Sequence, residues 1–94
     1  MEERAERISK LLREAAETHH VVYRITDGDD PDWATWYSRW LVDLSELPEI
    51  LGTDLVRSEV TYMLVKLDRA FGSEQPGGAW EDYYAERLIE HFAP

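Results

Sequence analysis

Apolar residues recur every three to four positions along most of the chain, which is the spacing that places them on one face of an α-helix. The pattern predicts helices over about residues 2–25, 31–44, 53–71 and 79–92. A short helical turn is expected over 45–51, with Gly52 as its end. The sequence therefore predicts an all-α fold, in which residues 1–94 form a single compact bundle of four helices with an additional short helical turn.

The ends of these helices rest on local signals. The segment 21–25 contains Val, Tyr and Ile and is also typical of a strand, but only residues 55–67 could pair with it, so we interpret it as helix. Asp30 followed by Pro31 is typical of an N-cap and a first-turn proline, so the second helix is predicted to begin there. Gly72 marks the expected end of the third helix.

The helical period also predicts which side chains are buried. His19 and Val22 fall on the apolar stripe of the first helix, and His91 falls on that of the last. On the second helix one side is expected to carry Trp33, Trp36, Tyr37, Trp40, Leu41 and Leu44, and the opposite side Thr35, Ser38, Arg39 and Val42.

The third helix carries apolar residues on two sides. Tyr62 and Val65 lie opposite its main stripe. Because a four-helix monomer needs to bury only one face of each helix, these two residues predict an interface between chains. A symmetric homodimer is the expected arrangement.

The charge of the chain limits its partners. Asp and Glu number 20 against 10 Lys and Arg, which gives a net charge of −10. This charge repels phosphate, so we expect no binding to nucleic acid or to a membrane, whereas a basic or amphipathic protein surface would be attracted. There is no Cys, and no apolar run long enough for a signal sequence or a membrane span. We expect a cytoplasmic protein of bacterial type.

Two motifs suggest metal binding, and neither is complete. Glu17 and His20 have the i,i+3 spacing of half a di-iron site, but no second Glu-x-x-His exists and both lie off the apolar stripe. The acidic loop 27–32 does not match a calcium loop, because Ser38 stands where a closing Glu is needed. We therefore expect no bound metal and no cofactor.

Aromatic and His side chains are the remaining candidates for function. Core packing is the main interpretation of these rings, and a half-exposed pocket or groove is the alternative. The candidate ligand-binding or partner-binding residues are His19, Tyr23, Trp36, Tyr37, Trp40, Trp80, Tyr83, Tyr84 and His91. No phosphate-binding glycine loop, nucleophile motif or catalytic triad is present, so enzyme activity is not favoured.

Three functions are consistent with these observations. The leading hypothesis is a small, acidic, non-enzymatic protein–protein interaction module that also self-associates. The alternative is a binder of a small apolar or cationic molecule that uses an aromatic and His pocket. The third is a metal-dependent helical-bundle enzyme.

Several short motifs spread over most of the chain carry a resemblance. They are Asp30-Pro31-Asp32-Trp33, Trp36-Tyr37, Ser58-Glu59, Leu64-Val65-x-Leu67-Asp68 and Trp80-Glu81-x-Tyr83-Tyr84-Ala85. With these motifs the chain resembles a small family of uncharacterised bacterial all-helical proteins. The family has no established activity, so the resemblance implies nothing about mechanism.

Overall fold

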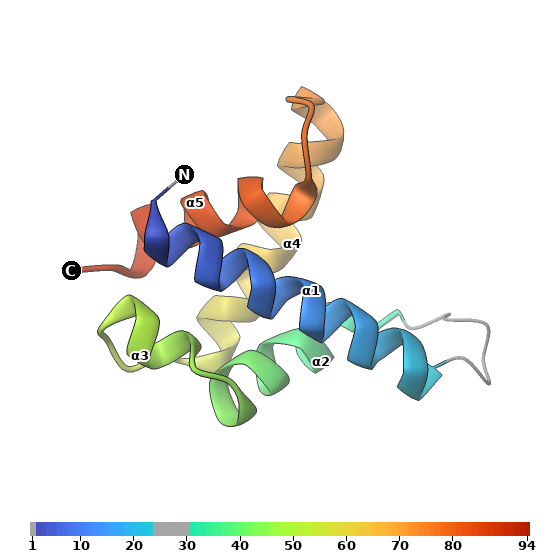
Figure 1. The fold of residues 1–94 in the computed structure, drawn as a ribbon. Helices are drawn as coiled ribbons and strands as arrows, with labels where there is room; N and C mark the ends of the chain where they lie inside the picture. Colours follow the sequence, from blue (N-terminus) through green and yellow to red (C-terminus); the bar gives the residue numbers. More distant parts are fainter. Residues whose placement is uncertain (1, 24–30) are drawn as a thin grey trace.

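The elements of the molecule are all helical in the part of the chain described by the computed structural model, residues 2–23 and 31–94. In chain order they are α1 (Glu3–Tyr23), α2 (Trp33–Arg39), a π-helical turn η2 (Trp40–Leu44), α3 (Leu47–Leu51), α4 (Arg57–Glu74) and α5 (Trp80–Phe92). The predicted all-α fold with one additional short helix is confirmed (Figure 1).

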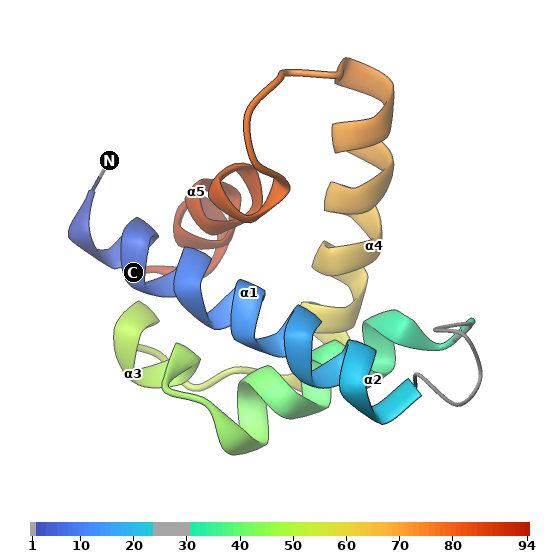
Figure 2. The same cartoon turned by 45° about the vertical axis from the view of Figure 1, so that its right-hand side comes forward.

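The helices pack mainly in two pairs. Helix α1 lies along α5, and α2 lies against α4. Helix α5 also contacts α4, and α1 contacts α2, which joins the two pairs into one bundle, while α3 packs against α1 (Figure 2). Segments from the two ends of the chain are therefore direct neighbours.

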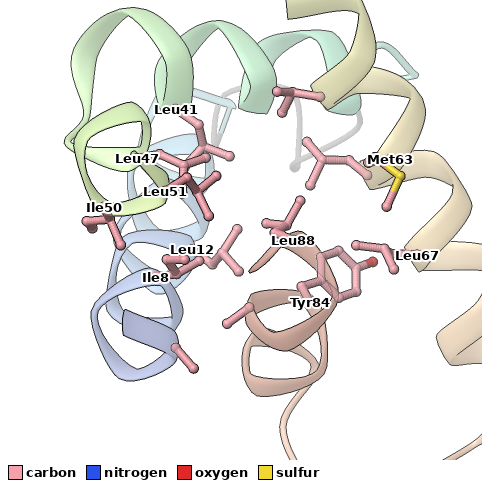
Figure 3. Close-up of a cluster of buried hydrophobic side chains, with 14 of the residues drawn as sticks. Ile8, Leu12, Leu41, Leu47, Ile50, Leu51, Met63, Leu67, Tyr84 and Leu88 are labelled. Atoms are coloured by element: carbon pink, nitrogen blue, oxygen red, sulfur yellow. The ribbon is translucent and has the colours of Figure 1, made fainter. Parts of the chain in front are cut away.

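Five leucines, one each from α1, η2, α3, α4 and α5, meet in the core. These residues are at most 1% exposed, and they are Leu12, Leu41, Leu47, Leu64 and Leu88. Figure 3 labels Leu12, Leu41, Leu47 and Leu88 among the buried side chains. Full burial of such a side chain stabilises a fold by about 1.5–3 kcal/mol relative to its exposure. The core therefore holds the helices of the bundle together.

The start of α2 differs from the prediction. The helix begins at Trp33 with Asp32 in the N-cap position, so Pro31 precedes the helix. The amides of Thr35 and Trp36 donate to the Asp32 carbonyl at 3.1 and 3.2 Å. The predicted cap, Asp30, lies outside the described residues, as do residues 24 and 25 at the expected end of α1.

The boundaries of α4 also differ, whereas those of α3 and α5 agree with the prediction. Helix α4 begins at Arg57 rather than near residue 53, and its first turn uses the Val56 carbonyl, which accepts from the amide of Val60 at 3.1 Å. At its other end α4 continues through Gly72 to Glu74, and Gln75 caps it in a left-handed conformation with φ 48°. Glycine inside a helix costs only about 1 kcal/mol relative to alanine, so it need not end one.

The predicted faces of α2 are wrong in part. Ser38, expected on the outer face, is 1% exposed, whereas Leu44, expected on the buried face, is 74% exposed. The Ser38 hydroxyl keeps hydrogen-bond partners although it is buried. It lies 3.0 Å from the Thr35 carbonyl oxygen, to which it donates, and 2.6 Å from Thr61 Oγ1 on α4. The wider turn of η2 then moves Leu44 off the stripe that an α-helix would continue.

Candidate functional site

An open pocket lies between α2, α4 and α5. Its volume is about 380 Å³. The residues that line it are Trp33 and Tyr37 from α2, Leu64, Asp68 and Phe71 from α4, and Trp80 and Tyr84 from α5. We call this the aromatic pocket. A cavity of this size with a few polar groups among aromatic rings is typical of a ligand site.

The rings of the aromatic pocket come in two perpendicular pairs. On α2, Trp33 and Tyr37 have ring centroids 5.8 Å apart and planes at 87°. On α5, Trp80 and Tyr84 have centroids 5.1 Å apart and planes at 78°. Such edge-to-face contacts are the favourable geometry for aromatic pairs, so each helix presents a preformed aromatic corner rather than loose rings.

Asp68 is the charged residue of the aromatic pocket, and it lies at the exposed side of the lining. Burial raises the pKa of the Tyr84 hydroxyl, and the negative charge of Asp68 and a hydrogen bond to its carboxylate raise it further. Burial likewise raises the pKa of Tyr37. Both phenols therefore stay neutral at ordinary pH, and Asp68 gives the pocket its negative charge. Figure 3 shows Tyr84 reaching from α5 toward α4.

Among the predicted site residues whose side chains the structure describes, those that line this pocket are Tyr37, Trp80 and Tyr84. His19 and Trp36 form a neighbouring cluster where α1 meets α2. Their ring centroids are 5.0 Å apart, and the Tyr37 ring lies 5.2 Å from that of His19. Tyr37 thus connects the His19 cluster to the aromatic pocket.

The other predicted site residues lie elsewhere. Trp40 is half-buried against the core, and Tyr83 packs on Phe71 with ring centroids 5.3 Å apart while its hydroxyl donates to Glu74 at 3.2 Å. His91 is exposed, which contradicts its expected place on the buried stripe of α5. The side chain of Tyr23 falls outside the described part of the structure.

Sequence reasoning missed four lining residues of the pocket, Trp33, Leu64, Asp68 and Phe71. A usable signal existed for Asp68. It stands four positions after Leu64 and three before Phe71, so it is a carboxylate on an otherwise apolar helical face.

The proposed dimer face is only partly available. Tyr62 is 64% exposed on α4, as its position opposite the main stripe predicts. Val65, in contrast, is half-buried and packs against the core of the same chain. Within the chain, α4 is therefore covered on more sides than the prediction assumed, and the homodimer stays a prediction that depends on Tyr62.

A second, polar cavity of about 360 Å³ lies between α1 and α5 and includes Ser9, Arg13 and Asp82 in its lining. The Ser9 hydroxyl, in a residue only 2% exposed, donates to Asp82 Oδ1 at 2.7 Å, and Arg13 Nη1 lies 3.4 Å from Ser9 Oγ. No histidine is among the lining residues, so the serine has no general base of the usual kind. We interpret this cluster as a structural link between α1 and α5.

The motifs considered for metals remain isolated. Glu17 and His20 are both exposed. Among residues 2–23 and 31–94, no three His, Asp or Glu side chains are grouped closely enough to hold a metal ion. Most of the acidic loop 27–32 falls outside these ranges.

The fold and the pocket together define an acidic, all-helical domain with one carboxylate in an aromatic cavity. No protein-family model matches the chain, and no curated protein or solved structure shows significant similarity to it. Within the ranges described, no helix is both long enough and apolar enough to cross a bilayer. The resemblance to an uncharacterised bacterial family stays an expectation.

Proposed function

We propose that the protein is a non-enzymatic interaction module that binds the basic surface of a partner protein, with a cationic side chain of the partner in the aromatic pocket. The observation that carries the proposal is the position of Asp68. It is a carboxylate on the rim of a cavity whose other lining residues are aromatic or apolar.

Charge acts at two ranges in this proposal. At long range the net charge of −10 attracts a basic surface and speeds its approach. At short range Asp68 and the ring faces attract a single cation, since a cation over an aromatic face gains about 0.5–2 kcal/mol, depending on how far it is desolvated. The pocket therefore supports a basic partner more than an acidic or neutral one.

The two alternatives have less support. A free small molecule would fit the volume of the pocket, but volume alone does not distinguish it from a side chain of a protein. A metal-dependent enzyme would need a cluster of ligands, and the described residues offer none.

The test compares two capped peptides of equal length, one built from Arg, Lys and Ser and the other from Glu, Asp and Ser. Binding is followed by the fluorescence of the pocket tryptophans and by calorimetry. We expect the basic peptide to bind and the acidic peptide not to bind. Absence of binding by the basic peptide would refute the proposal.

Matched charge variants separate the pocket from the general charge of the surface. Asp68→Asn and Asp54→Asn both remove one negative charge, but Asp54 is exposed in the loop before α4 and does not line the pocket. We expect Asp68→Asn to weaken binding of the basic peptide by about tenfold, which corresponds to about 1.4 kcal/mol, and Asp54→Asn to have a much smaller effect. Equal losses would show that the pocket is not the binding site.

A further inference from the structure

The hydrogen-bonding groups of the aromatic pocket restrict which cation it accepts. The tryptophan N–H groups are donors only, and the Tyr84 hydroxyl lies close enough to the Asp68 carboxylate for that carboxylate to raise its pKa. The acceptors left for a ligand are the Asp68 carboxylate and the hydroxyl oxygens of the two tyrosines. Leu64 and Phe71 offer none.

A guanidinium brings more donors than this pocket can satisfy, and a primary ammonium can satisfy its donors only by turning all of them toward Asp68 and the two tyrosine hydroxyls. A primary ammonium has three N–H donors and a guanidinium has five, and each donor that is desolvated without a partner weakens binding. A quaternary ammonium has no N–H donor. Its charge is spread over alkyl groups that pack directly on ring faces.

The arrangement of the rings points the same way. A planar guanidinium binds best when it stacks flat on an aromatic face. In this pocket the rings within each pair meet at 87° and 78°, which makes corners rather than parallel walls. A compact, rounded cation fits a corner better than a flat one.

We propose that the aromatic pocket selects a quaternary alkylammonium group, held by cation–π contacts with the rings of α2 and α5 and by the charge of Asp68. The proposal rests on the pocket being the binding site of the proposed function. The chemistry has two sources, a trimethylated lysine on a partner protein and a free quaternary ammonium compound.

The experiment uses one basic peptide in three forms that differ at a central residue. The residue is lysine, trimethyllysine, or the neutral analogue in which a carbon replaces the quaternary nitrogen. The fourth probe is free tetramethylammonium. Affinities for the full chain are measured by calorimetry and by tryptophan fluorescence.

We expect the trimethyllysine peptide to bind about tenfold more tightly than the lysine peptide. The neutral analogue should lose this gain, because it keeps the shape and loses the charge. Asp68→Asn should reduce the preference and Asp54→Asn should keep it. Circular dichroism of both variants verifies that they fold.

Each outcome bears on a different claim. If lysine binds as tightly as trimethyllysine, selection of a quaternary cation is refuted and the proposed function stands. If the neutral analogue binds as tightly as trimethyllysine, the pocket selects apolar shape and the inference is again refuted. If tetramethylammonium binds in the pocket and none of the peptides does, the inference stands with a small-molecule source and the proposed function fails.

Discussion

Replacing Ser9 by alanine should lower the free energy of unfolding by about 1.5 kcal/mol. The Ser9 hydroxyl donates to Asp82 across the α1–α5 contact at 2.7 Å, and Ser9 is 2% exposed. A hydrogen bond to a charged group contributes about 1.5–3 kcal/mol. We expect the low end of this range, because Asp82 is half-buried and water can replace the lost donor.

The assay is urea unfolding followed by tryptophan fluorescence, with Ser73→Ala as the matched control. Ser73 is exposed near the end of α4, and surface changes of this kind usually stay within about 0.5 kcal/mol. The midpoint for Ser9→Ala should fall while the slope stays unchanged, which is the signature of a pure change in stability.

A double-mutant cycle with Asp82→Ala isolates the interaction itself. If the hydrogen bond links α1 to α5, the sum of the losses in unfolding free energy of the two single variants should exceed the loss in the double variant by about 1 kcal/mol. Strict additivity, or a Ser9→Ala midpoint equal to that of Ser73→Ala, would show that the contact contributes nothing to stability.

Four further predictions follow from single residues. Leu12→Ala should destabilise the domain by about 2–5 kcal/mol in urea unfolding, because this core side chain is fully buried. Gln75→Gly should stabilise it by about 0.5–1 kcal/mol in the same assay, because φ is 48° there and glycine adopts that conformation without strain. The pKa of Tyr84 is raised in the folded chain above its ordinary 10.0, so as pH rises Tyr84 ionises in the unfolded chain before it does in the folded chain. The stability that is present below pH 10 should therefore fall as the pH rises further. A spectrophotometric titration of the folded protein in which all tyrosines ionise together near pH 10 would contradict this. Tyr62→Glu should convert a dimer into a monomer in sedimentation equilibrium, and a native chain that is already monomeric at micromolar concentration would refute the dimer.

The long helices could be predicted because their periodicity is sustained. Helices α1 and α5 each carry an apolar stripe over several turns, and their observed bounds agree with the pattern where the structure describes them. Helix α2 has only seven residues before η2 begins, so its pattern held too few turns to define a face. Burial of Ser38 depends on its hydrogen-bond partner Thr61 on α4, and the periodicity of α2 alone does not predict that partner.

The aromatic pocket could be predicted only in part for a similar reason. The pattern identified Tyr37 and Tyr84 as aromatic candidates on separate helices. It did not reveal that α4 lies between those helices and adds Asp68, since the relative rotation of packed helices depends on side chains from all of them. Periodicity in the sequence predicts which residues share one face of a helix, but it does not predict which residues from three helices line the same pocket.

The pairing of α1 with α5 has a consequence for the order of events during synthesis. Ser9 and Asp82 are 73 positions apart, so α1 packs against a helix that is made much later. Until residues 80–92 leave the ribosome, the apolar side of α1, with Ile8 and Leu12, has no α5 to cover it. Between the synthesis of α1 and that of α5 the nascent chain therefore carries part of this hydrophobic surface uncovered, and the contact between α1 and α5 can form only after α5 has been made.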